Sequence, residues 1–186
     1  MRREYTILVD EREKKPLTFP DHMVVWDPSS PILKPRTTTV RLRTRSCRLP
    51  TGDYLIEGFE RCVIAERKGS LQELHGNLMT PNGRRKFTDE LVRLRNECRE
   101  PLVLLEGDPL SLQSSCPRDI PPELVRDALL HTLAEYNVPL MLLPTSSVSA
   151  RREAAVWLAA TLIRGTLCQT SEPRPLPSNP SATPRV

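Results

Sequence analysis

Two carboxylates and one lysine in the segment from Asp53 to Lys68 have residue types and spacing that suit phosphodiester hydrolysis. Asp53 begins a short apolar strand, and Glu66 and Lys68 end the next one, two residues apart and therefore on the same face. Hairpin pairing of the two strands would bring Asp53 toward this pair. Two carboxylates at one point suit a hard divalent cation such as Mg²⁺, which acts as a Lewis acid and lowers the pKa of a bound water. A neighbouring lysine would orient or deprotonate that water and screen the negative charge of the phosphodiester.

The same residues also have a simpler interpretation. Glu66, Arg67 and Lys68 could form a solvated strand end, with Asp53 as a turn residue, because this spacing of charged residues occurs by chance in many proteins. The apolar run 63–65 favours the catalytic interpretation, since a buried strand would deliver Glu66 to its end. The pattern is that of the restriction-endonuclease-like nucleases, but by itself it leaves both interpretations open.

The composition indicates a globular protein and excludes several other classes. The 186 residues, 38% hydrophobic and 27% charged, suit one domain with a core large enough to fold without disulfides. The 5 cysteines are widely spaced, which indicates reduced thiols rather than a disulfide framework or a zinc site. With 7 glycines beside 19 prolines, a Gly-rich phosphate loop is excluded. The sequence contains no apolar window long enough for a membrane span and no secretory signal, so we expect a cytoplasmic protein.

The hydrophobic pattern predicts the elements that must position these residues. Apolar runs predict strands over residues 5–9, 38–45, 54–56, 61–65, 102–105 and 140–143, and an edge strand over 23–26. Apolar residues at helical spacing predict helices over 70–78, 84–99, 122–136 and 149–163, with an interruption at 81–83. Alternating strands and helices in the second half imply parallel pairing and an α/β sandwich. We expect one domain over 1–167 and a disordered tail rich in proline and serine over 168–186.

Basic residues are concentrated in particular stretches, although 27 Lys+Arg against 23 Asp+Glu leave a net charge of only +4. Three arginines share one side of the predicted strand 38–45: Arg41, Arg43 and Arg45. Such a row could be an ordinary solvated face, since edge strands often carry charge. Close to a nuclease site it would instead contact backbone phosphates without reading sequence, and we favour that interpretation. Arg84 and Arg85, at the start of a predicted helix, are further candidate DNA contacts or ordinary exposed residues.

Three motifs resemble the signatures of one nuclease family. Residues 9–13 read VDERE, residues 49–54 read LPTGDY, and residues 66–68 read ERK. In this order and spacing they resemble the VDxRE, LxxGDY and ERK signatures of the XPF/Mus-type structure-specific endonuclease domain, within the PD-(D/E)xK superfamily. The resemblance extends over roughly residues 5–165. One departure follows ERK, where Gln72 stands at a position of an expected aspartate and Glu73 supplies the nearest carboxylate.

The resemblance implies an α/β fold of the restriction-endonuclease-like type, with a central mixed sheet flanked by helices. It also implies that Asp10, Asp53 and Glu66 bind a metal, with the backbone carbonyl of Arg67 as a further ligand. Lys68 would be the catalytic lysine, and Arg67 would contact phosphate or hold the acids by ion pairing. Additional candidates are two weaker acidic groups and one more DNA contact: Glu13, Glu73 and Arg12. The implied cofactor is Mg²⁺, for which Mn²⁺ could substitute.

These inferences lead us to expect a Mg²⁺-dependent DNA endonuclease acting in repair, recombination or replication. Its expected substrate is branched or flapped DNA, or a single-strand/double-strand junction. The resemblance further implies a homodimer or a heterologous partner protein, and a stand-alone domain without a helix-hairpin-helix module. Trp157 is expected in the core or in a dimer face. The protein would be nucleoid-associated or phage-encoded in a bacterial host, or nuclear in a eukaryote.

Two other functions remain open from the sequence. One is a non-catalytic scaffold of the same fold that binds DNA or dimerises. The other is a sequence-specific nuclease of the restriction type. Inactive partners in this family typically lose the acids of the GDY and ERK motifs, whereas Asp53 and Glu66 are present here, which favours the catalytic function.

Overall fold

A computed structural model describes residues 3–27, 30–31, 33–107, 120–144 and 146–167, so the predicted tail lies outside the described residues. The strands are β1 (Glu4–Asp10), β2 (His22–Trp26), β3 (Thr37–Cys47), β4 (Tyr54–Ile56), β5 (Val63–Lys68), β6 (Glu100–Glu106) and β7 (Leu140–Leu143). The helices are α1 (Leu71–Met79), α2 (Pro81–Glu97), α4 (Pro122–Tyr136) and α5 (Val148–Leu167). Each predicted strand and helix corresponds to one of these elements.

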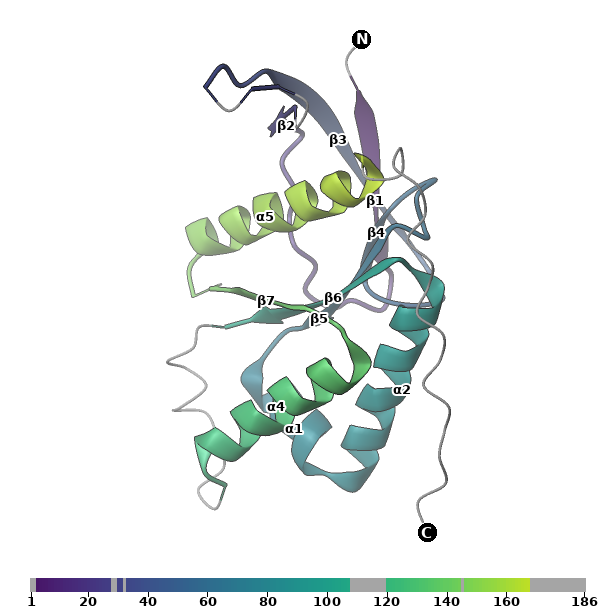
Figure 1. Cartoon of the computed structure of the whole chain (residues 1–186), viewed down its shortest axis with the longest axis vertical. Coiled ribbons are helices and arrows are strands. Elements are labelled where there is room, and N and C mark those ends of the chain that lie inside the picture. Colours follow the sequence, from purple (N-terminus) through teal and green to yellow (C-terminus); the bar gives the residue numbers. More distant parts are fainter. Residues whose placement is uncertain (1–2, 28–29, 32, 108–119, 145, 168–186) are drawn as a thin grey trace.

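The strands of the described part form one mixed sheet in the order β2-β3-β1-β4-β5-β6-β7 (Figure 1). β1 pairs in parallel with β3, and β5 and β7 each pair in parallel with β6. The pairs β1–β4, β2–β3 and β4–β5 are antiparallel. The predicted α/β class with a mixed sheet is confirmed, as are the edge position of β2 and the parallel pairing in the second half.

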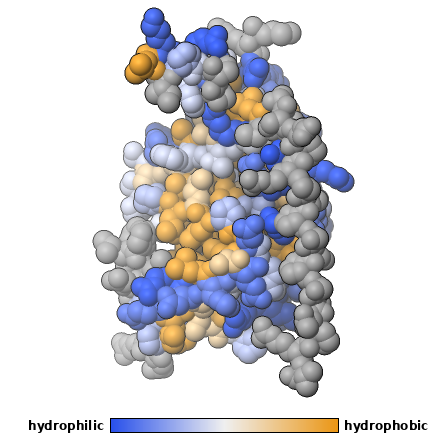
Figure 2. All heavy atoms as spheres, in the orientation of Figure 1, coloured by the Kyte–Doolittle hydropathy of each residue, from blue (hydrophilic) through white to orange (hydrophobic). Residues whose placement is uncertain are grey.

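Helices cover both faces of the sheet (Figure 1). α5 packs on one face, over a cluster that includes Ile7 and Ala65, whereas α1, α2 and α4 pack on the other, over a cluster that includes Leu8 and Ile64. Consecutive residues thus enter different clusters, because successive side chains of a strand point to opposite faces. Figure 2 shows hydrophobic residues gathered in the layer between α5 and α4, where β7 forms an edge of the sheet. No helix of the described chain is both long and apolar enough to cross a membrane.

α5 lies close to the sheet because its inward side carries small residues. Ala155 and Ala159 are buried, and a Cβ added at Gly165 would lie 1.9 Å from Cγ2 of Val63. Trp157 lies on the outward side of α5 and is 57% exposed. The expectation of a core position for Trp157 is therefore wrong, and its place in a dimer face stays a prediction.

α2 begins at Pro81, earlier than the sequence pattern predicts. Thr80 caps the helix, since its Oγ1 accepts a hydrogen bond from the N–H of Gly83 at 3.1 Å. Pro81 suits the first helical position, where its missing N–H would have no partner within the helix. The predicted interruption at 81–83 is therefore wrong, because these residues form the first turn of α2.

The turn before β4 requires glycine at position 52. Gly52 has a φ of 72°, and a Cβ there would lie 2.2 Å from Cγ2 of Ile64. Gly58, after β4, has a similar φ of 79°, but nothing lies within 4 Å of a Cβ at that position. Gly52 is therefore needed both for the left-handed backbone and for the close approach of the next strand.

We expect Gly52→Ala to destabilise the protein more than Gly58→Ala does. Both substitutions place alanine in the left-handed region, at a cost of about 1–2 kcal/mol. Only Gly52→Ala adds the contact with Ile64. Free energies of unfolding from urea titrations would measure the difference, and equal losses would show that the close approach of the strands contributes nothing.

Candidate active site

The residues of the predicted hydrolytic site lie at strand ends on one face of the sheet. Asp53, Glu66 and Lys68 share the face on which α1 and α2 pack, because side chains alternate along each strand. Leu55 and Ile64, two residues from Asp53 and Glu66 respectively, belong to the buried cluster on that face. Antiparallel pairing of β4 with β5 brings Asp53 to the end of β5. The structure therefore brings the three predicted residues together.

Asp53 is bound to the strands on both sides. Its N–H donates to the carbonyl of Ala65 at 2.8 Å, and its own carbonyl accepts from the N–H of Asp10 at 2.9 Å. Its Oδ2 accepts from the N–H of Arg67 at 2.7 Å. Burial and the charge of Glu66 raise the pKa of Asp53 to about 7, although the hydrogen bond from Arg67 opposes this rise. Its negative charge is thus disfavoured unless a cation is near.

Lys68 is buried among carboxylates from three elements. Its Nζ lies 2.9 Å from Oε1 of Glu66, 2.8 Å from Oε2 of Glu90 on α2, and 4.0 Å from Oε1 of Glu73 on α1. The ring centroid of Phe87 lies 5.3 Å from the same nitrogen. Burial opposes the ammonium charge, but Glu66 and Glu90 outweigh it and raise the pKa of Lys68 above its ordinary value. Lys68 is therefore a cation in the folded protein.

Glu73, the predicted outer carboxylate, lies at the margin of this cluster. Its N–H donates to Oγ of Ser70 at 3.1 Å, which caps α1. Its Oε2 accepts from the N–H of Gly69 at 3.1 Å. The first turn of α1 therefore holds this carboxylate beside the end of β5.

The acids leave oxygens that suit a divalent cation. Oδ1 of Asp53 and Oε2 of Glu66 accept no hydrogen bond from any described residue. Burial raises the pKa of Glu66 against the pull of Lys68, so a bound cation would relieve the cost of both carboxylate charges. Within the described ranges, no three His, Cys, Asp or Glu side chains are grouped to hold a metal. Mg²⁺ is usually bound by one or two carboxylates, with water and substrate phosphates as further ligands, so Asp53 and Glu66 fit this ion.

Asp10 lies beside Asp53, but its carboxylate is engaged by other groups. Oδ1 accepts from the N–H and Nε of Arg12, both at 2.7 Å. Oδ2 accepts from Nη2 of Arg12 at 2.7 Å and from the N–H of Leu49 at 2.9 Å. The hydrogen bonds from Arg12 lower the pKa of Asp10 to about 2, although burial opposes them. These contacts favour a structural role for Asp10 and Arg12, and metal ligation by Asp10 stays a prediction.

Arg67 extends to the opposite face of β5 and is buried there. Its Nε lies 2.6 Å from Oε1 of Glu106, and its Nη1 lies 2.8 Å from Oε1 of Glu13. Glu106 also pairs with Nη1 of Arg151 on α5 at 2.6 Å. The side chain of Arg67 is only 6% exposed, which favours ion pairing over phosphate contact. The geometry likewise favours Glu13 as a partner of Arg67 rather than as a metal ligand.

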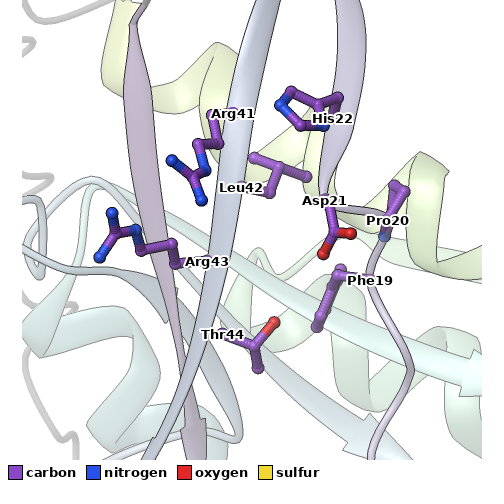
Figure 3. A pocket seen from close by; sticks show the side chains of 8 residues that line it. All are labelled: Phe19, Pro20, Asp21, His22, Arg41, Leu42, Arg43 and Thr44. Atoms are coloured by element: carbon purple, nitrogen blue, oxygen red, sulfur yellow. The ribbon is translucent and has the colours of Figure 1, made fainter.

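The arginine row of β3 shares the sheet face that carries the acids. Arg45 lies opposite Leu8 of β1 in the parallel pairing, and Leu8 belongs to the cluster beneath α1 and α2. Arg41 and Arg43 project to the side of β3 opposite from Leu42 (Figure 3). The row therefore leads along β3 on the face where Asp53 and Glu66 lie.

These arginines are exposed and pair with surface carboxylates. Nε of Arg43 lies 2.8 Å from Glu4, and Nη2 of Arg45 lies 2.5 Å from Glu57. Such exposed pairs contribute little to stability, so a phosphate could exchange with the carboxylates. On α2, Arg84 and Arg85 are exposed and form no ion pair with a described residue.

A cavity of about 630 Å³ lies between β3 and the segment that leads into β2 (Figure 3). Two residues of the arginine row, Arg41 and Arg43, line this cavity. The complete lining is Phe19, Pro20, Asp21, His22, Arg41, Leu42, Arg43 and Thr44. Neither Asp53 nor Glu66 lines it, so this cavity is separate from the candidate metal site.

Glu90 and Glu106 are the residues of the site that sequence reasoning missed. Glu90 lies three residues after Phe87 and directly before Leu91, at the border of the apolar face of α2, and that position was a usable signal. Glu106 ends the strand beside β5, but no local pattern indicates that it would pair with Arg67.

Comparisons with known proteins identify the fold. The sequence profile of the ERCC4 domain matches residues 9–160. XPF from Aeropyrum pernix has a similar structure, with 19% sequence identity and a TM-score of 0.56, and the match covers 96% of this chain and 69% of that one. The same protein in complex with DNA matches at 21% identity and a TM-score of 0.56, over 90% of this chain and 68% of that one. A search of curated proteins finds no match.

The raised pKa of Asp53 leads to a prediction for stability and metal binding. The folded state favours the protonated carboxyl group of Asp53. Protonated Asp53 therefore stabilises the fold fully below its ordinary pKa of 3.8, and this stabilisation is lost as pH rises through about 7. Mg²⁺ requires the ionised carboxylate, so it should raise the melting temperature more above pH 7 than near pH 5, by roughly several degrees.

Thermal unfolding at both pH values, in EDTA and in Mg²⁺, would measure this effect. Asp53→Asn should weaken the Mg²⁺ effect and reduce its pH dependence, to which Glu66 also contributes, whereas Asp127→Asn on α4, where the carboxylate is exposed, should retain both. An equal Mg²⁺ effect at both pH values in the unsubstituted protein would contradict the assignment of Asp53.

Proposed function

Because the chain belongs to the ERCC4-domain family, we propose that it is a metal-dependent DNA endonuclease that hydrolyses phosphodiester bonds. This membership confirms the resemblance indicated by the three sequence motifs. The observation that carries the proposal is the meeting of Asp53, Glu66 and Lys68 at one end of the β4–β5 hairpin. The ion we propose is Mg²⁺, for which Mn²⁺ could substitute.

The geometry supports a division of labour among the residues. Asp53 and Glu66, with the backbone carbonyl of Arg67, would hold the ion, which supplies Lewis acidity and an activated water. Lys68, whose pKa is raised, stays protonated and would donate hydrogen bonds to the attacking water or to a phosphate oxygen. These hydrogen bonds would stabilise the negative charge that develops on the phosphate. Arg67, paired with Glu13 and Glu106 on the other face, holds the peptide whose N–H binds Asp53.

DNA is the substrate that the surface supports best. The arginine row on β3 suits the backbone of a nucleic acid, and the Aeropyrum pernix relative has been solved with DNA. By analogy with the family, we propose branched, flapped or junction DNA as the substrate, with repair, recombination or replication as the process. The same proposal includes a homodimer or a heterologous partner protein. It also places the protein with the DNA of a bacterial cell, of a phage-infected cell or of a nucleus.

The two alternatives have less support. A non-catalytic scaffold would not need the buried set of Asp53, Glu66 and Lys68, whose burial is costly without a function. A sequence-specific restriction-type nuclease would need contacts to base edges, whereas exposed arginines along a strand suit phosphates.

The catalytic proposal predicts that Glu66→Gln and Lys68→Ala each lower the cleavage rate by more than about 100-fold, because a metal ligand or a charge-stabilising group is lost. The measurement is cleavage of labelled flap, fork and single-stranded DNA in Mg²⁺ or Mn²⁺, with EDTA abolishing it. Glu97→Gln at the end of α2 is the matched control and should cut normally. If the unsubstituted protein cuts no DNA in either metal, or if the variants cut as it does, the proposal is wrong.

The arginine row predicts a loss of binding without a change of sequence preference. Arg43→Ala should weaken DNA binding and lower the slope of log affinity against log salt by about 1, because one phosphate contact is removed. Arg126→Ala on α4 is the control, since its side chain is 53% exposed against 57% for Arg43. Fluorescence anisotropy across a salt series would measure both variants. An unchanged slope for Arg43→Ala would favour the alternative interpretation, in which the arginine row is an ordinary solvated face.

A further inference from the structure

Lys68 is held by residues of two helices as well as by its own strand. Its side chain is almost fully buried, so its ammonium group requires nearby carboxylates. Glu66 lies 2.9 Å from Nζ and Glu90 lies 2.8 Å from it, whereas Glu73 is 4.0 Å away and far more exposed. Lys68 therefore pairs closely with two carboxylates, Glu66 of β5 and Glu90 of α2.

Glu66 cannot serve Lys68 and a divalent cation equally. Once a cation is bound by Glu66, the carboxylate charge is largely neutralised toward Lys68, and the cation repels the ammonium group. Glu90 is then the close carboxylate that still attracts Nζ. Its side chain is more exposed than that of Glu66, and its second oxygen accepts no hydrogen bond from a described residue.

α2 provides a rigid base for Glu90. The residues of this helix that face the sheet are fully buried: Phe87, Leu91 and Leu94. Glu90 lies between two of them in sequence, and Phe87 also packs near the ammonium group, with its ring centroid 5.3 Å from Nζ. A carboxylate on such an element keeps a constant position relative to β5.

We propose that Glu90 is a positioning residue that holds the ammonium group of Lys68 beside the metal site. This inference rests on the proposed nuclease function and deepens it, because it assigns to α2 a part in catalysis. Glu90 acts through Lys68 and does not touch the substrate. Its loss therefore lowers the cleavage rate and leaves DNA affinity unchanged.

The first measurement needs neither metal nor DNA. The native protein is treated with an amine-acetylating reagent, and acetylation of Lys68 is followed by mass spectrometry relative to the exposed Lys86 on the same helix. Glu90→Gln and Glu90→Ala should raise the relative acetylation of Lys68 several-fold, with the larger rise in Glu90→Ala. Asp89→Asn, which removes a neighbouring exposed charge, should leave it unchanged. Melting temperatures establish that the compared variants are folded, and Glu90→Gln preserves the shape if Glu90→Ala unfolds.

The second measurement separates catalysis from binding. In single-turnover cleavage, Glu90→Gln should lower the maximal rate by roughly 10-fold or more, with the dissociation constant for DNA within about two-fold of the unsubstituted value. Asp89→Asn should match the unsubstituted protein in both. This inference alone would be overturned if the unsubstituted protein cuts DNA and Glu90→Gln changes neither the acetylation of Lys68 nor the maximal rate. Failure of the unsubstituted protein to cut DNA would instead overturn the nuclease function on which it rests.

Discussion

The antiparallel pairing of β4 with β5 is the constraint on which the site depends. The left-handed backbone of Gly52 allows the turn to pass close to Ile64, and the next residue then donates its N–H to the carbonyl of Ala65 at 2.8 Å. Asp53 is thereby placed so that its carboxylate meets the N–H of Arg67. Without this pairing, Asp53, directly before β4, and Glu66 of β5 would belong to separate strand ends, and no common site would form.

Alternation along β5 divides the charged ERK segment between two environments. Glu66 and Lys68 point toward α1 and α2, where the lysine is shared with Glu90. Arg67 points the other way, into a chain of ion pairs that reaches α5 through Glu106. Buried charges are costly unless they are paired. Lys68 pairs with Glu90 of α2, whereas Arg67 pairs with Glu106 of β6, which pairs in turn with Arg151 of α5. The helices therefore do more than cover the sheet, since α2 and α5 each contribute an ion pair to the charged network on their own side of β5.

The fold and the centre of the site were predictable because they depend on short-range patterns. Runs of apolar residues mark the strands, and the separation of two residues places Glu66 and Lys68 on one face. Local sequence patterns predicted the structure less reliably at positions where neighbouring residues decide the outcome. Pro81 usually signals a break, but after the cap supplied by Thr80 it begins α2. Trp157 is a large aromatic residue in an apolar stretch, which predicts a core position. In the structure the small residues beside it, Ala155 and Ala159, face the sheet instead.

The sequence by itself determined the order of the elements, the side of each strand on which a residue lies, and the presence of two acids and a lysine at adjacent strand ends. Only the tertiary structure decided which groups each charge meets. Asp10 is engaged by Arg12 and by the backbone of Leu49, and Lys68 is engaged by Glu90 of a distant helix. The physical reason is that periodicity specifies the direction of a side chain relative to its own element, whereas its partners are set by how separate elements pack together.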